Sequence, residues 1–175
     1  TERLRITSGG NIGVAGWMGY SNERATNIPS GDIVDITAGE GTGYAITSSR
    51  QIIPWGEAGH GTHDIPEELQ SNVKMLSAGW HHTLGLNYDG QAFAWGRDHF
   101  GQGSLPEGFN NSGIVQVAAQ ATTSMVLYED GTIYAWGWMG NDTYDLTPPE
   151  GLNDVVHFHL GWESVAALKS DGTVV

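Results

Sequence analysis

Cysteine is absent from the 175 residues, and lysine and arginine together number only 7. The absence of cysteine excludes a disulfide framework and any zinc site built on thiolates. The shortage of cations leaves a formal charge of −13, because 20 side chains are acidic. A polyanion would be repelled, so we expect neither nucleic acid nor an anionic membrane as a partner. No apolar run approaches the roughly 20 residues that span a bilayer, so we expect no membrane insertion.

Helical periodicity is also lacking, and only Asp64–Gln70 has the composition for about one helical turn. The chain starts at Thr1 without methionine or a signal-like segment, so we expect a processed or trimmed piece of a longer protein. Glycine (26 residues) and tryptophan (7 residues) are plentiful, which is typical of a rigid, turn-rich β protein. Together with the scarcity of cations, this composition predicts an extracellular or virion location.

An internal repeat is the main feature of the sequence. Gly56, Gly96 and Gly137 each follow a tryptophan, and they are 40 and 41 residues apart. A fourth anchor, Gly16, precedes Gly56 by 40 residues, because "VAGWMGY" (Val14–Tyr20) aligns with "AWGWMGN" (Ala135–Asn141). A partial fifth copy, "SDGTVV", ends the chain. A fixed period of this size is typical of repeat architectures.

Each copy holds two short apolar segments around a small-residue break, then a tight turn and a third segment that leads into Trp-Gly. The turn is Asp-Gly in three copies, at Asp89, Asp130 and Asp171, and this pair is a strong hairpin signal. The first copy has Gly9-Gly10, and the second departs from the rule with Ser49-Arg50. Three or four short strands per 40 residues predict all-β propeller blades, about four in number, within a single domain over 1–175.

The segment "VKMLSAGWHHTLGLNYDGQAFAWG" (Val73–Gly96) resembles the regulator-of-chromosome-condensation repeat family, with His82 at the family's histidine position. Thr42, Thr123 and Ser164 occupy that position in the other copies. The short loops are similar to those of the bacterial subset that includes the propeller-type β-lactamase inhibitor. The resemblance covers essentially the whole chain and implies the fold, but the family hosts exchange factors, inhibitors and many other roles.

Two departures from the family pattern concern the ends of the chain. The family's propellers have seven blades, whereas this chain holds about four. Its start, "TERLRI" (Thr1–Ile6), aligns with "ESVAAL" (Glu163–Leu168), so the two ends duplicate part of a blade and do not complete one another. We therefore expect an open arc, or part of a seven-bladed ring, whose exposed end strands invite self-association.

The tryptophans fall into two groups. Trp55, Trp95 and Trp136 belong to the repeated Trp-Gly and are expected to be structural. Four others occupy positions that the repeat leaves free, and variable loop positions on a repeat scaffold are where binding surfaces arise. The alternative is that they merely cover blade edges or the central channel. The predicted partner-facing residues are Trp17, Met18, Tyr20, Trp80, His81, Asp98, Phe100, Trp138, Met139, Tyr144 and Trp162.

The sequence predicts no metal, cofactor or catalytic residue. His157 and His159 share one strand face but have no evident third ligand, and His82 is expected to be a structural histidine. The glycine-rich Gly39–Gly43 precedes no helix that could hold a phosphate. No serine, histidine and acid stand in a recognisable catalytic context.

The interpretation that follows is a non-catalytic binding or structural module, not an enzyme. It would hold a protein, or a glycan, against its aromatic-rich loops. Two alternatives stay open: a structural or receptor-binding component of a phage virion or extracellular assembly, and a secreted inhibitor of the β-lactamase-inhibitor kind. A nucleotide-exchange role by family analogy fits poorly with so acidic a chain that covers about half a ring.

Overall fold

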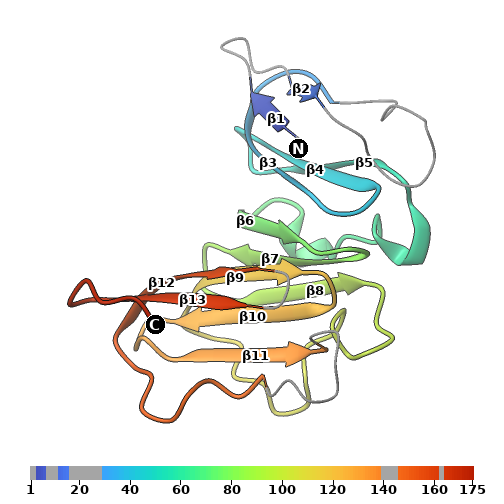
Figure 1. Ribbon diagram of the computed structural model, residues 1–175. Coiled ribbons are helices and arrows are strands. Elements are labelled where there is room, and N and C mark those ends of the chain that lie inside the picture. The colour runs from blue at the N-terminus through green and yellow to red at the C-terminus, as the bar shows by residue number, and fades with distance from the viewer. Residues whose placement is uncertain (1–2, 7–11, 16–28, 139–145, 162–163) are drawn as a thin grey trace.

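The computed structural model describes residues 3–6, 12–15, 29–138, 146–161 and 164–175, the first two ranges as backbone only. Within these ranges the chain forms five small antiparallel sheets, which we number as blades one to five (Figure 1). Their strands are β1 (Arg3–Ile6) and β2 (Ile12–Ala15); β3 (Ile33–Ala38), β4 (Thr42–Thr47) and β5 (Ile52–Gly56); β6 (Val73–Ala78), β7 (His82–Asn87) and β8 (Ala92–Gly96); β9 (Ile114–Gln120), β10 (Thr123–Tyr128) and β11 (Ile133–Gly137); β12 (Val155–Leu160) and β13 (Val165–Lys169).

Blades two, three and four are three-stranded meanders in which the middle strand pairs with both neighbours. The two apolar segments of each repeat become the first two strands, and the segment before Trp-Gly becomes the third. Two short 3₁₀ turns, η1 (Gly59–Gly61) and η2 (Glu67–Leu69), lie in the loop between blades two and three. The single helical turn predicted at Asp64–Gln70 is therefore confirmed. None of the helices in the described ranges is long and apolar enough to cross a membrane.

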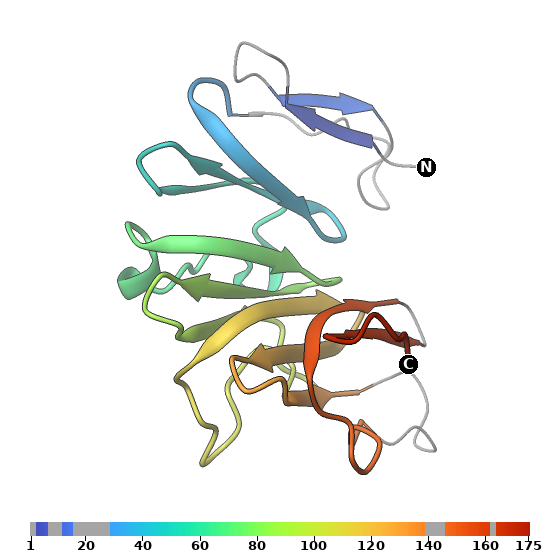
Figure 2. The same ribbon diagram turned by 90° about the vertical axis from the view of Figure 1, so that its left-hand side faces the viewer.

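The blades follow one another in chain order along an arc (Figure 2). The N-terminal hairpin lies at one end of the arc and blade five at the other. The first strands of successive blades are neighbours, with β3 against β6, β6 against β9 and β9 against β12. Side chains join these strands directly: Ser77 Oγ accepts the amide of Ala119 at 2.9 Å, and Gln116 Nε2 donates to the carbonyl of Phe158 at 2.7 Å. The predicted all-β propeller arc is confirmed.

The core consists of layers between neighbouring blades. One layer joins Tyr44 and Ile46 of blade two to Leu76 and Trp95 of blade three. The next layers join blade three to blade four and blade four to blade five. The middle strands β4, β7 and β10 are almost wholly buried. Strands β7 and β10 each lie between two such layers, and β4 contributes both to the layer with blade three and to a cluster within blade two. This explains why they have apolar side chains on both faces and lack the strict alternation of a half-exposed strand.

The Trp-Gly pair has a steric cause. Trp55, Trp95 and Trp136 are buried in the core, which confirms their structural role. The glycine that follows has a positive φ of 88°, 99° and 97° in blades two, three and four. A Cβ there would lie 2.3 to 2.5 Å from the carbonyl oxygen of the preceding turn. Only glycine satisfies both constraints.

The Asp-Gly turns are hairpins, as predicted, and they also join blades. Gly90 and Gly131 have positive φ, and their carbonyls accept the amides of Ile114 and Val155 at the start of the next blade. Arg50 takes the equivalent position in the second copy with a φ of 63°, which is the conformation that glycine occupies elsewhere. The side chain of Arg50 lies over the ring of Tyr88 in the next blade, 5.1 Å from its centroid.

Candidate functional site

Two kinds of loop meet at one end of the blades, which we call the Trp-Gly end. They are the turns between the first and second strands, at 39–41, 79–81 and 121–122, and the loops that begin after Gly56, Gly96 and Gly137. They meet because the second strand starts opposite the end of the third: Thr42 pairs with Gly56, His82 with Gly96 and Thr123 with Gly137. All the described partner-facing residues predicted from the sequence lie at this end.

Backbone hydrogen bonds align the turns of the Trp-Gly end into a row. The amide of Glu40 donates to the carbonyl of Trp80 at 3.0 Å, and the amide of Trp80 donates to the carbonyl of Ala121 at 3.0 Å. The amide of Trp138 in turn donates to the carbonyl of Thr122 at 2.9 Å. Trp80 and Trp138, which are 58 residues apart in sequence, are thus held near one another by rigid backbone.

Exposed aromatic rings extend this row. Phe100 stacks on Trp138 with ring centroids 4.7 Å apart and planes 19° apart. Phe100 is 45% exposed and Trp80 is 36% exposed, so both present apolar area to solvent. The buried Gln102 holds the Phe100 loop, because its Oε1 accepts the Phe100 amide at 2.8 Å. We call Trp80, Phe100 and Trp138 the aromatic row.

A polar group adjoins the row between blades two and three. His81 Nε2 lies 3.8 Å from a carboxylate oxygen of Glu40, and its ring lies 4.9 Å from that of His60. Burial lowers the pKa of His81; Glu40 opposes this effect, whereas His60 and Arg97 add to it. His81 is therefore a neutral hydrogen-bonding group at neutral pH.

Asp98 belongs to the same end, but both of its carboxylate oxygens organise its own loop. Oδ1 accepts the amide of Gly103 at 2.9 Å, and Oδ2 accepts the hydroxyl of Ser104 at 2.8 Å. These bonds support the loop that presents Phe100. The other predicted residues, Trp17, Met18, Tyr20, Met139, Tyr144 and Trp162, lie outside the described residues.

His82 is structural, as predicted. It is 1% exposed, and its Nε2 lies 3.1 Å from Ser124 Oγ in the next blade. Ser124 donates its only proton to the carbonyl of Gln102 at 2.8 Å, so His82 must donate through Nε2. Nδ1 is then an unprotonated, buried acceptor that has no hydrogen-bond partner within the described residues. Burial accordingly lowers the pKa of His82 from 6.5 to about 4.

This pKa predicts a pH-dependent stability. The unfolded chain binds a proton at His82 below pH 6.5, whereas the folded chain does so only below about pH 4. The contribution of neutral His82 to the free energy of unfolding is thus fully present above pH 6.5 and lost as the pH falls toward 4, about 3 kcal/mol in all. Urea unfolding from pH 7.5 to 4.5 measures it. His82→Thr, which copies the residue of two other repeats, should flatten the slope, and an equal slope in both proteins would contradict the assignment.

No group of three or more histidine, aspartate or glutamate side chains is placed to hold a metal ion in the described part of the chain. Sequence reasoning did, however, miss a second feature at the opposite end of blade four. There the loop 107–113 and the turn between β10 and β11 form a pocket with Tyr134. The available signals were the acidic residues around an Asp-Gly turn and a tyrosine on a third strand, but only the fold brings them together.

Comparisons with known proteins agree with this architecture. Residues 73–102 match the model of the "Regulator of chromosome condensation (RCC1) repeat", and this range begins with the segment that carried the resemblance in the sequence. The chain is 26% identical over 173 residues to the ultraviolet-B receptor UVR8 of Arabidopsis thaliana, a match that covers 79% of this chain and 39% of the receptor. It is 28% identical over 161 residues to Protein RCC1 of Candida albicans, a match that covers 69% of this chain and 34% of that protein.

Among solved structures, the ectodomain of the Physcomitrella patens receptor kinase CR4 superposes with a TM-score of 0.74 at 17% identity. That superposition covers 98% of this chain and 48% of the ectodomain. The chain therefore spans less than half the length of these relatives. Residues 73–102 thus match one RCC1 repeat, and the chain as a whole shares the propeller-blade architecture of these relatives.

Proposed function

We propose that this chain is a non-catalytic protein-binding module whose contact surface is the aromatic row at the Trp-Gly end. The observation that carries the proposal is the exposure of Trp80 and Phe100 on loops that backbone and buried side chains hold in place. Large aromatic side chains on a rigid base form the energetic centres of protein interfaces, because they bury much area at little conformational cost. The neutral His81 beside Glu40 would supply polar contacts at the rim.

Relatives support the class of function. RCC1-type proteins bind protein partners: one solved structure is "Kap60 bound to yeast RCC1 (Prp20)", with 19% identity to this chain. Some relatives are ligases, such as human HERC2, but this chain matches only 4% of that protein. A glycan is a second ligand class that exposed aromatic rings can hold. β-Lactamase inhibition stays a prediction from the loops alone, and an inhibition assay tests it.

The test compares two matched variants for retention of partners. Trp80→Ala with Phe100→Ala removes the described exposed rings of the row, whereas Tyr88→Ala removes a more exposed ring at the opposite end of blade three. Proteins from an extract of the source organism, captured on immobilised chain and quantified by mass spectrometry, should be reduced at least tenfold by the double variant only. Urea unfolding confirms that both variants are folded. A captured set that is unchanged by the double variant would refute this choice of surface.

A structural role in an extracellular or virion assembly is the second candidate. It is favoured by apolar side chains on blade five, where β13 pairs with β12 on one side and with residues 173–175 on the other. Val156, Val174 and Val175 expose apolar side chains there. Exposed apolar side chains on a sheet can be covered by a second copy of the chain. Light scattering across concentration tests it, since a mass that stays monomeric excludes self-association.

A further inference from the structure

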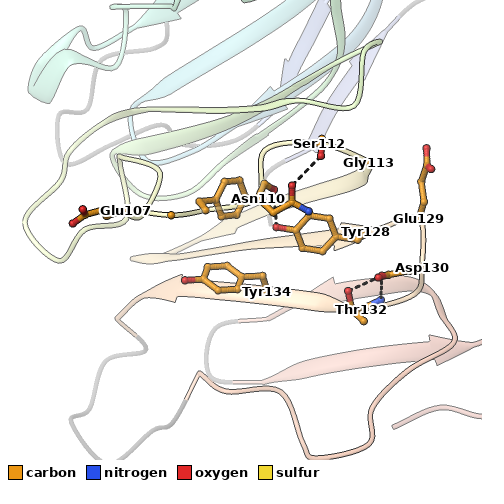
Figure 3. Close-up of a pocket in the computed structure, with 11 residues that line it drawn as sticks. Glu107, Asn110, Ser112, Gly113, Tyr128, Glu129, Asp130, Thr132 and Tyr134 are labelled. Carbon is orange, nitrogen blue, oxygen red and sulfur yellow. Dashed lines mark hydrogen bonds between the residues drawn. The ribbon is translucent and has the colours of Figure 1, made fainter.

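A pocket of about 460 Å³ lies at the end of blade four opposite to the aromatic row (Figure 3). Loop 107–113 forms one side of the pocket, and the turn between β10 and β11 forms the other. The turn and the loop are joined by the amide of Glu129, which donates to the carbonyl of Gly113 at 2.8 Å. The pocket is therefore built by two segments whose relative position is fixed.

Aromatic rings line the pocket and are held in place. Phe109 contacts the edge of Tyr134 with centroids 5.5 Å apart, and it also packs on Trp136 at 5.4 Å. The hydroxyl of Tyr128 donates to the carbonyl of Asn110 at 2.9 Å. Tyr134 is 41% exposed although it belongs to this cluster. An incoming group thus meets preformed ring surface.

The charges of the pocket have one sign. Glu107, Glu129 and Asp130 line it, and none of its described lining residues is a lysine, arginine or histidine. Asp130 Oδ1 accepts the amide of Thr132 at 2.9 Å and its hydroxyl at 2.6 Å, and the hydroxyl bond contributes most to lowering the pKa of Asp130. Within the part of the chain that the structure describes, none of the three carboxylates lies within ion-pair distance of a basic side chain.

The pocket also adjoins the outer edge of β11. β11 is the last strand of its sheet, and Tyr134 lies on it. Among the described residues no backbone hydrogen bond reaches its outer edge. An extended peptide can pair with such an edge through its main chain while one of its side chains enters a neighbouring pocket.

We propose that this pocket binds an arginine side chain of an extended segment of a partner protein that lies along the outer edge of β11. A guanidinium stacks on tyrosine faces and donates in a planar fork to carboxylates, so it uses both the rings and the acids. An uncharged glycan would use the rings but leave the carboxylates without a cation. The charge of −13 on the whole chain attracts a basic segment from a distance.

The probe is a nine-residue threonine peptide with one central arginine, fluorescently labelled, and its binding is followed by anisotropy at low salt. A second peptide has citrulline in place of arginine, which keeps the shape and removes the charge. Asp130→Asn is compared with Asp171→Asn. Asp171 makes the same two bonds to Thr173 in the corresponding turn of blade five, at 2.9 and 2.6 Å, so the control removes the same charge from the same motif.

We expect the citrulline peptide to bind at least tenfold more weakly than the arginine peptide. Asp130→Asn should weaken the arginine peptide about fivefold, and Tyr134→Ala by a similar factor, whereas Asp171→Asn should leave its affinity within about twofold. Equal losses for the two Asp→Asn variants would show attraction to net charge alone and overturn the site. So would undetectable peptide binding, equal binding of citrulline, or binding of an oligosaccharide that depends on Tyr134 and not on Asp130. Because the aromatic row lies at the other end, these outcomes are independent of those above.

Discussion

Replacing Gly137 by alanine is expected to lower the free energy of unfolding by about 3 kcal/mol or more. Two effects add at this position. The residue has a φ of 97°, which a side chain disfavours, and a Cβ would lie 2.3 Å from the carbonyl oxygen of Thr122. That oxygen also accepts the Trp138 amide, so it cannot move aside without breaking a bond of the Trp-Gly end. Urea unfolding followed by tryptophan fluorescence measures the loss.

Gly151→Ala separates the two effects. Gly151 also has a positive φ, 78°, but nothing lies within 4 Å of a Cβ built there. Its replacement should therefore involve conformational strain alone, about 1 kcal/mol. If both variants lose equal stability, the carbonyl contact is unimportant and the steric explanation of the repeated Trp-Gly is wrong.

A double-mutant cycle at Leu69 and Gly85 is expected to show strong coupling. Leu69 is fully buried between blades two and three, and its truncation to alanine should lower the free energy of unfolding by about 3 kcal/mol. A Cβ on Gly85 would lie 2.2 Å from Leu69 Cδ2, so Gly85→Ala alone should lower it by about 2 kcal/mol. In the Leu69→Ala background that contact no longer exists, and the added methyl group partly fills the space.

The combined loss should fall short of the sum of the single losses by at least about 1 kcal/mol. Rescue is incomplete, because Leu76 and Trp95 also lie 3.2 Å from the same Cβ and must shift slightly. Strict additivity in urea unfolding would mean that the loop residue Leu69 does not pack into blade three as described. The cycle therefore tests how a loop outside the blades completes their core.

The blades could be predicted from sequence because their signals are local and recur. Asp130-Gly131 specifies its own turn, and Trp136-Gly137 combines a buried ring with a backbone conformation that only glycine takes. His82 was placed correctly as structural, but its partner Ser124 is in another repeat, and no spacing rule identifies it. Contacts between repeats depend on the rotation between blades, which a single repeat does not encode.

The sites were less predictable for the same reason. Trp80 and Phe100 stood out because the repeat does not require them, and they do lie at one end. Asp98 is of a residue type that often contributes to binding, yet its carboxylate oxygens accept hydrogen bonds from its own loop. The pocket of Tyr134 depends on Phe109, in a loop whose sequence differs between copies. Arg50 shows the converse, since a residue that breaks the turn rule still adopts the turn's conformation.

The pair of hydrogen bonds between the side chain of Gln116 and the main chain of Phe158 has a consequence for how the molecule unfolds. The side-chain amide of Gln116 donates to the carbonyl of Phe158 at 2.7 Å and accepts the backbone amide of Phe158 at 3.3 Å, as the main chain of a neighbouring strand would. Among the described residues, side-chain to main-chain links of this kind join blade two to three, three to four and four to five, so cooperativity is passed from neighbour to neighbour. Hydrogen exchange should then be slowest in β7 and β10 and become faster toward β13. An arc has one interface fewer than it has blades. Closing the arc into a ring would add one more interface, and every blade would then pack between two neighbours.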